Sequence, residues 1–96
     1  MNNTAVSADD MPSIAPKFRL QWEEAQGCHV LLYPEGMVKL NGPAGEILKR
    51  CDGERTVADI IADLSNQFPG AESLSDDVYN FLSTAHENQW IRRQSA

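Results

Sequence analysis

The feature that most constrains this fold is a pair of short apolar runs joined by a three-residue break. The runs cover residues 30–33 and 37–40, and Pro34-Glu35-Gly36 separates them. Because Pro and Gly interrupt both helices and strands, the break predicts a tight hairpin turn between two strands. Asn41-Gly42-Pro43 follows, in which Asn41 or Gly42 can cap a helix and Pro43 suits its first position. The stretch therefore predicts strand, turn, strand and helix in direct succession.

The flanking sequence predicts one more strand and two more helices. Residues 18–23 alternate apolar and polar, which indicates a half-buried strand, and residues 28–33 and 37–40 supply the other two. The last of these lies at the sheet edge if the strands are ordered as in the sequence. Helices are expected over residues 43–52, from Thr56 to just before Phe68, and from Ser73 or Ser75 onward. The order predicts an α+β fold, a three-stranded antiparallel sheet followed by three helices. Trp90 and Ile91 then close the core or add a short strand.

Length and charge limit the class of protein. The 96 residues fit one domain, with residues 1–16 predicted as a disordered tail and residues 17–93 as the folded unit. The net charge of -6 disfavours nonspecific attraction to nucleic acid or anionic lipid. No apolar run approaches the roughly 18 residues of a membrane span, and no signal peptide is apparent. Two cysteines do not make a disulfide scaffold, so a cytoplasmic protein without membrane contact is expected.

Side chains that carry chemistry are sparse. His29, His86, Cys28 and Cys51 are not at metal-ligand spacing from one another, and no phosphate loop, nucleophile elbow or metalloprotease motif is present. We therefore predict no catalytic residue, no metal and no cofactor, and a protein that is not an enzyme.

Two kinds of binding function remain. A small sheet with three helices is compatible with a winged helix-turn-helix regulator, but the third helix has no Lys or Arg and begins with Asp76 and Asp77, which disfavours DNA. The strand over residues 36–40 is able to accept an extended peptide by strand addition. It is equally compatible with an ordinary edge blunted by Lys39, and the pattern alone leaves both readings open.

Several long stretches of this sequence resemble one family. The stretches that carry this similarity are LLYPEGMVKLNGPAGEILKRCDG, then TVADIIADL, then DVYNFL with a later Trp. Over about residues 13–92 the chain is similar to the PqqD family of pyrroloquinoline quinone (PQQ) biosynthesis. One departure is Gln89, where relatives often have Gly. The resemblance implies a winged helix-turn-helix-like peptide-recognition element of the kind that serves ribosomally made, modified peptides. It also implies a non-enzymatic chaperone that binds the precursor peptide PqqA and presents it to the radical S-adenosylmethionine enzyme PqqE.

Combining this resemblance with the pattern gives a hypothesis for the site. The peptide is expected to add a strand beside Met37, Val38, Lys39 and Leu40, so Val38→Pro should weaken binding if the Val38 amide faces the incoming strand. The third helix supplies the other wall. One flank of that helix carries Ser75, Tyr79, Leu82 and His86, and the other carries Asp77, Asn80 and Thr84. The sequence does not choose between the flanks. Because a mixture of apolar and polar side chains suits a peptide pocket, our interpretation favours the first flank, with Val78, Tyr79 and Leu82 as contacts.

Two further points stay open at this level. Lys39, Lys49 and Arg50 either meet acidic peptide residues or are ordinary strand and helix-end charges. The chain is expected to be a monomer or a homodimer, since an open edge permits strand exchange between copies.

Overall fold

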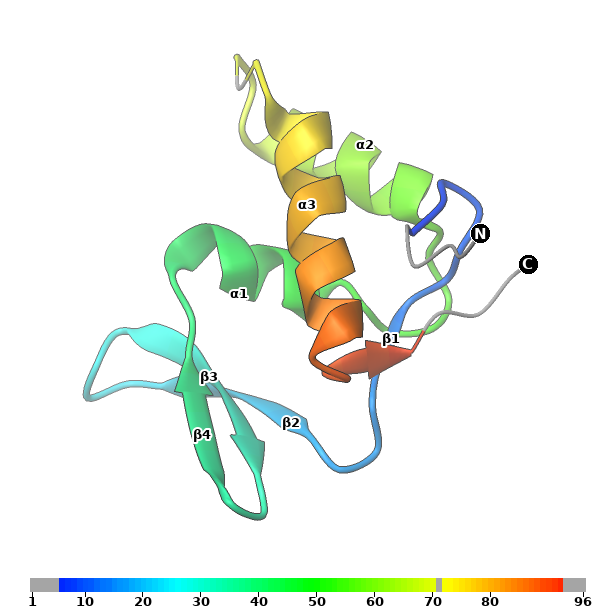
Figure 1. Cartoon of the computed structure of the whole chain (residues 1–96). Coiled ribbons are helices and arrows are strands. Elements are labelled where there is room, and N and C mark those ends of the chain that lie inside the picture. Colours follow the sequence, from blue (N-terminus) through cyan, green and yellow to red (C-terminus); the bar gives the residue numbers. More distant parts are fainter. Residues whose placement is uncertain (1–5, 71, 93–96) are drawn as a thin grey trace.

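A computed structural model describes residues 6–70 and 72–92 of the chain. Three antiparallel strands precede three helices, and a two-residue strand lies at each end of this unit (Figure 1). The elements are β1 (Ser13–Ile14), β2 (Arg19–Glu23), β3 (Cys28–Tyr33), β4 (Gly36–Lys39), α1 (Gly42–Lys49), α2 (Val57–Gln67), α3 (Leu74–Glu87) and β5 (Ile91–Arg92). The predicted fold class is confirmed, and so is the short strand at Ile91.

The main sheet has the order β2-β3-β4, so β4 is an edge strand as predicted. The register pairs Leu31 with Leu20 on β2 and with Val38 on β4. Side chains at these positions point to one face, where they join the core, and those of Arg19, Gln21 and Lys39 point to the other. The hairpin predicted from Pro34-Glu35-Gly36 is present, since Tyr33 pairs with Gly36.

Capping residues set the helix boundaries. Asn41 Oδ1 accepts a hydrogen bond from the Ala44 amide at 2.8 Å, and Pro43 occupies the first turn of α1. Thr56 and Asp59 form the reciprocal capping box of α2. The first helix was expected to reach Asp52, but α1 ends at Lys49 with Arg50 as its C-cap.

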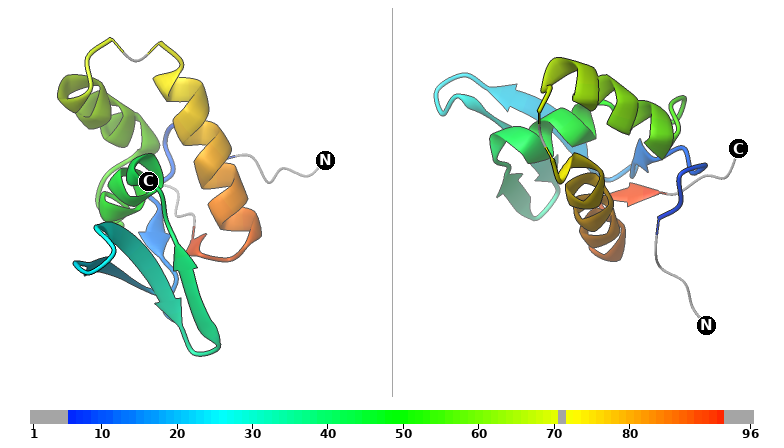
Figure 2. Two further views of the ribbon diagram at one scale, coloured as in Figure 1. Left: turned by 90° about the vertical axis from the view of Figure 1, so that its left-hand side faces the viewer. Right: turned by 90° about the horizontal axis from the view of Figure 1, so that it is seen from above.

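The core lies between the inner face of the sheet and the helices. Leu31, Leu48, Ile60 and Leu82 are its largest fully buried apolar side chains. Figures 1 and 2 show that α1 lies next to the sheet, with α2 and α3 beyond it. The backbone of α1 approaches β3 closely at Gly45, where a Cβ atom would lie 2.6 Å from Nδ1 of His29.

The amino-terminal segment differs from the disordered tail that the sequence predicts for residues 1–16. Residues 1–5 lie outside the described part of the chain, but Val6, Asp10 and Pro12 are buried, and β1 pairs with β5. The carbonyl oxygens of Asp10 and Ala8 accept from the Val57 and Ala58 amides at 2.9 and 3.2 Å. Amides in the first turn of a helix have no partner within it. The amino-terminal segment is therefore held in place, because its carbonyl oxygens accept hydrogen bonds from the first amides of α2.

Candidate functional site

The open edge of β4 provides backbone groups for a further strand. Leu40 donates its amide to the His29 carbonyl at 3.0 Å, which makes His29 and Leu40 a hydrogen-bonded pair. Such pairs alternate along an antiparallel ladder, so Val38 also directs its backbone toward β3. The amides and carbonyls of Met37 and Lys39 therefore point away from the sheet. The Val38→Pro test devised from the sequence removes a bond within the sheet instead of one to a ligand.

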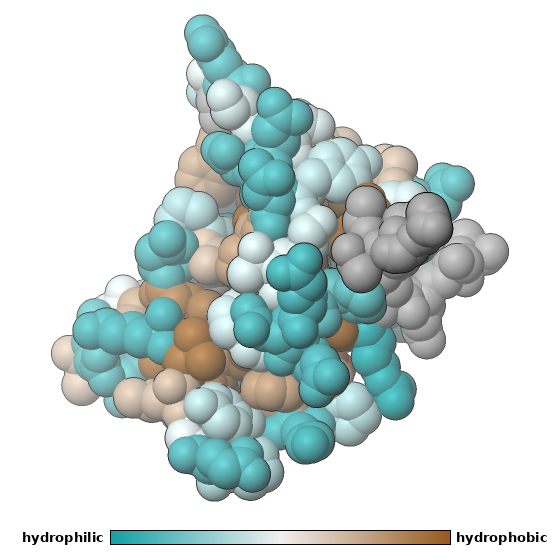
Figure 3. Space-filling view, in the orientation of Figure 1, coloured by the Kyte–Doolittle hydropathy of each residue, from teal (hydrophilic) through white to brown (hydrophobic). Residues whose placement is uncertain are grey.

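A groove of about 370 Å³ runs between β4 and α3. Its walls come from both these elements, its end from the first turns of α1, and one corner from the residue before β5. Figure 3 shows hydrophobic side chains gathered at the surface between the sheet and the helices. The lining residues are Val38, Lys39, Leu40, Asn41, Pro43, Ala44, Ile47, Asp77, Phe81 and Trp90. An edge strand beside an apolar groove matches the geometry used by domains that bind extended peptides.

Two helix ends place the aromatic and apolar walls of the groove. The Asn41 cap turns the chain from β4 directly into α1, which brings Pro43 and Ile47 beside the end of the strand. At the end of α3, the Trp90 amide bonds to the Ala85 carbonyl at 2.9 Å. Gln89 adopts the left-handed conformation there, with a φ of 64°, and this turn directs Trp90 toward Phe81, with ring centroids 6.4 Å apart.

Two further hollows are present, and one of them adjoins the groove. A cavity of about 500 Å³ opens between the three helices and shares Pro43, Ile47 and Asp77 with the groove; half-exposed Phe68 lies on its rim. A larger hollow of about 780 Å³ lies near the hairpin turn and the end of α3. Its lining residues are Ala15, Pro16, Lys17, Phe18, Tyr33, Glu35, His86, Gln89, Ile91 and Arg92.

The strand residues predicted for the site lie where the hypothesis needs them. Met37 and Lys39 are exposed, with Met37 at 49%, and Val38 is half-buried at the groove. Leu40 is buried but also lines the groove.

The helix residues predicted for the site do not lie in the groove. Val78 and Leu82 are 0% exposed and belong to the core. Half-buried Tyr79 lines neither the groove nor either of the two further hollows. On α3 the groove is lined by Asp77 of the opposite flank and by Phe81, which belongs to neither flank. The flank favoured from the sequence does not line this groove, because a helical wheel orders side chains around an axis but does not fix how the helix is rotated on the sheet.

Sequence reasoning missed Pro43, Ile47 and Trp90 as wall residues. A signal for the first two was present, since the Asn41-Gly42-Pro43 break makes α1 follow β4 without a linker. No such local signal existed for Trp90, because its position depends on the turn at Gln89.

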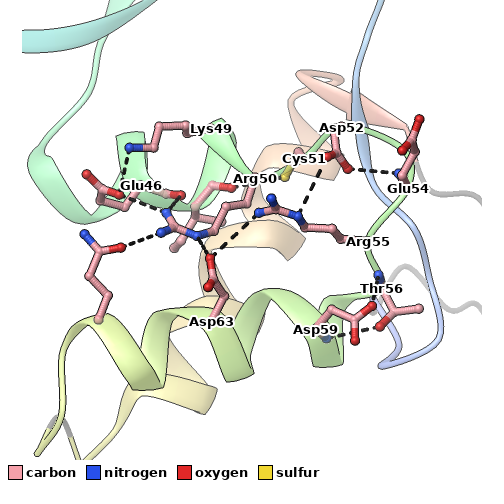
Figure 4. A network of polar contacts seen from close by, with 12 residues as sticks. Glu46, Lys49, Arg50, Cys51, Asp52, Glu54, Arg55, Thr56, Asp59 and Asp63 are labelled. Carbon is pink, nitrogen blue, oxygen red and sulfur yellow. Dashed lines mark hydrogen bonds and ion pairs between the residues drawn. The ribbon is translucent and has the colours of Figure 1, made fainter.

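Two of the cations considered for peptide contact are used within the protein. Arg50 is only 7% exposed; it bonds to Glu46 of α1 and joins α1 to α2 through Asp63 (Figure 4) and Gln67. Its hydrogen bonds lower the pKa values of the Asp63 and Glu46 carboxyls. Lys49 pairs with Glu46 at 3.4 Å. Arg50 therefore stabilises the helices that form the end of the groove, and Lys39 is left as the cation on β4.

The candidate metal ligands among the described residues are His, Cys, Asp and Glu side chains, and the free cysteines are candidate nucleophiles. Nowhere in the described residues do three or more His, Cys, Asp or Glu side chains gather as a metal-ligand set. Burial raises the pKa of the Cys51 thiol to about 12, so this thiol is not a nucleophile at neutral pH. None of the helices in the described part of the chain has the length and apolar character that a membrane crossing requires.

The fold and the groove define a winged helix-turn-helix-like domain that has an apolar groove beside an open sheet edge. A solved structure with this arrangement superposes with a TM-score of 0.80 at 30% identity, covering 97% of this chain and 100% of the other. It is the solution structure of the PqqD truncation of PqqCD from Methylobacterium extorquens, described as a stand-alone recognition element for ribosomally synthesized, post-translationally modified peptides.

Sequence comparison identifies the family. The family described as Coenzyme PQQ synthesis protein D (PqqD) matches residues 28–91. A protein of Azotobacter vinelandii is 52% identical over 83 residues, which are 86% of this chain and 90% of that relative, and is named PqqA binding protein. A Pseudomonas paraeruginosa protein with the same name is 53% identical over 88 residues, covering 92% of this chain and 96% of the relative. The chain belongs to the PqqD family.

Proposed function

We propose that this chain binds the precursor peptide PqqA as an added strand on β4 and presents it to the radical S-adenosylmethionine enzyme PqqE, without being an enzyme itself. The observation that carries the proposal is the open edge, where Met37 and Lys39 direct their backbone groups outward beside the apolar groove. The name shared by its relatives, PqqA binding protein, supports the choice of ligand.

In this arrangement the backbone and the side chains have different tasks. Hydrogen bonds from Met37 and Lys39 give affinity that is largely independent of the peptide's sequence. Alternate peptide side chains point into the groove against Phe81, Trp90 and Ile47, which gives selectivity for apolar residues at that spacing. Presentation to PqqE requires that the part of the peptide outside the groove stays accessible.

The first experiment tests strand addition from the side of the peptide. Synthetic PqqA is titrated into the protein by calorimetry, and single backbone N-methyl groups are then moved along the peptide. Only every second amide of an added strand faces its neighbour, so we expect binding to be lost at alternate positions and retained between them. Saturable binding with a uniform response to N-methylation would contradict strand addition, and no saturable binding would refute the ligand.

The second experiment tests the groove with a matched pair of variants. Phe81 and Tyr79 are both half-buried aromatic residues of α3, but only Phe81 lines the groove. Removal of an interface aromatic typically costs about 1–2 kcal/mol, so Phe81→Ala should weaken PqqA binding about 5–30-fold and Tyr79→Ala should not. Circular dichroism checks that both variants are folded. Equal effects of the two variants would remove the groove from the proposal.

The step with PqqE is tested separately, by following modification of PqqA by mass spectrometry with PqqE and either protein variant. Phe81→Ala should slow the modification at peptide concentrations below saturation, and excess peptide should restore it. A rate unaffected by Phe81→Ala would separate peptide binding from presentation. The alternative of DNA binding is disfavoured, because α3 begins with the acidic Asp76 and Asp77.

A further inference from the structure

Some Lys and Arg side chains of this acidic chain form ion pairs within the protein, and others do not. Among the described residues, Lys49, Arg50 and Arg55 form ion pairs with carboxylates of the α1–α2 region. The other described cations form no ion pair within that part of the chain; they are Lys17, Arg19, Lys39 and Arg92. Four of the seven described cations are therefore unpaired, although the protein carries a net charge of -6 and more acidic than basic side chains.

Two of these free cations lie on one hollow. Lys17 and Arg92 both line the 780 Å³ hollow near the hairpin turn, although 74 positions in the sequence lie between their numbers 17 and 92. His86 lines the same hollow, and its Nδ1 atom is buried without a hydrogen-bond partner. Glu35 is the one carboxylate on this lining.

The floor of the hollow is aromatic. Phe18 and Tyr33 lie with ring centroids 5.3 Å apart, and both line it. Apolar walls lower the local dielectric constant, which strengthens the attraction between a cation and an incoming anion. The chemistry of the lining therefore suits a carboxylate on a carbon chain better than a strongly hydrated inorganic ion.

The linings of the hollow and of the β4 groove come close to each other in the sequence at two places. Tyr33 pairs with Gly36, the first residue of β4, and Glu35 on the lining precedes that residue. On the side of α3, Gln89 of the hollow is followed by Trp90 of the groove. A peptide strand that pairs with β4 is therefore expected to reach this hollow when it continues past Gly36.

We infer that the hollow between the hairpin turn and the end of α3 is a second subsite, which binds a carboxylate side chain of the peptide just beyond the segment paired with β4. The inference rests on the proposed peptide binding and deepens it. Backbone pairing alone lets a strand slide along β4, whereas an acid held by Lys17 and Arg92 fixes one register. The subsite thus makes the position of an acidic residue a condition for recognition.

The test compares variants that each remove one positive charge, so that the three variants have the same net charge. Exposed ion pairs contribute about 0.2–1 kcal/mol each, so Lys17→Gln and Arg92→Gln should each weaken PqqA binding about 1.4–5-fold at low salt. Arg55→Gln removes the same charge from a site that lines none of the hollows and should leave the Kd unchanged. Glu35→Gln should act in the opposite direction and tighten binding, because it removes the only acid on the lining.

The identity of the bound acid follows from double-mutant cycles with peptide variants. Each Asp or Glu of PqqA is changed to its amide in turn, and a further peptide carries an amidated carboxyl terminus. One of the side-chain amides should weaken binding to the wild-type protein but not to the Lys17→Gln, Arg92→Gln double variant. Coupling only to the amidated terminus would overturn the assignment to a side chain.

The failure of this inference is distinguishable from failure of the proposed function. If PqqA binds and Phe81→Ala weakens it, while Lys17→Gln, Arg92→Gln and Arg55→Gln have equal effects, the acid subsite is refuted and the groove remains. Purely additive effects in every cycle refute it as well. If PqqA does not bind at all, the proposed function and the subsite are both overturned.

Discussion

Gln89→Gly should stabilise the protein, because Gln89 occupies a backbone conformation that favours glycine. The helix α3 ends at Glu87 with Asn88 as its C-cap, and Gln89 follows with a φ of 64°. The Gln89 amide bonds to the His86 carbonyl at 3.0 Å and the Trp90 amide to the Ala85 carbonyl at 2.9 Å. These two bonds form a Schellman motif, whose left-handed position is usually glycine.

The expected gain follows from two opposing contributions. A residue with a Cβ in the left-handed region costs roughly 1–2 kcal/mol. Glycine removes this cost but loses about 0.5–1 kcal/mol through the greater freedom of the unfolded chain. The midpoints of these two ranges leave a net stabilisation of about 0.75 kcal/mol. For a domain of 60–100 residues this corresponds to a rise in Tm of about 3–6 °C.

The assay is thermal and urea unfolding followed by circular dichroism, with Asn88→Gly as the matched control. Asn88 has a φ of -85° and its Nδ2 atom donates to the Thr84 carbonyl at 3.1 Å. Glycine at position 88 therefore relieves no unfavourable backbone conformation and removes this hydrogen bond, so Asn88→Gly should destabilise the protein by about 1 kcal/mol. A lower Tm for Gln89→Gly, or the same change for both variants, would refute the argument from backbone conformation.

Three further predictions concern packing, pH and thiol reactivity. A Cβ at Gly45 would lie 3.1 Å from the Cβ and Cγ of His29 as well as 2.6 Å from its Nδ1, so Gly45→Ala should destabilise by about 1–2 kcal/mol net of its gain in helix propensity. Urea unfolding should show a smaller cost in a His29→Ala background, and an equal cost would contradict a steric cause. The Arg50 hydrogen bond lowers the pKa of the Asp63 carboxyl in the folded protein. Its stabilising contribution is therefore full above the unfolded pKa of about 4 and is lost as the pH falls through the lower folded value. Asp63→Asn should accordingly be less stable than wild type at pH 7, and this difference should shrink in melts at pH 3; a constant difference would disprove the linkage. Because burial raises the Cys51 pKa to about 12, iodoacetamide at pH 8 should label Cys51 only in urea, as peptide mapping by mass spectrometry will test.

Local signals were sufficient to predict most of the fold. The Pro34-Glu35-Gly36 break, the Asn41 cap and the Thr56 capping box each act through neighbours within a few residues. Strand β3 was predicted with its observed limits, residues 28–33. The edge position of β4 followed from assuming that sequential strands pair, which holds here.

Long-range contacts account for what the sequence did not reveal. The segment around Asp10 is ordered by amides of Val57 and Ala58, which lie more than 40 positions later in the chain. The direction of the Val38 backbone depends on its ladder with β3, and no single-strand pattern encodes it. The rotation of α3, which turns Phe81 and not Tyr79 to the groove, results from the packing of Val78 and Leu82 in the core.

An open sheet edge invites indiscriminate pairing, and the features of β4 limit this. The strand is only four residues long, and it carries the charged Lys39 where it is exposed. A chance partner therefore gains few backbone bonds, too few to offset the ordering of its chain. Stable binding requires additional contacts, which the apolar groove at Phe81 and the cationic hollow at Lys17 are placed to supply. The short edge thus contributes to specificity, because only a peptide that satisfies both side-chain sites at the same register binds well.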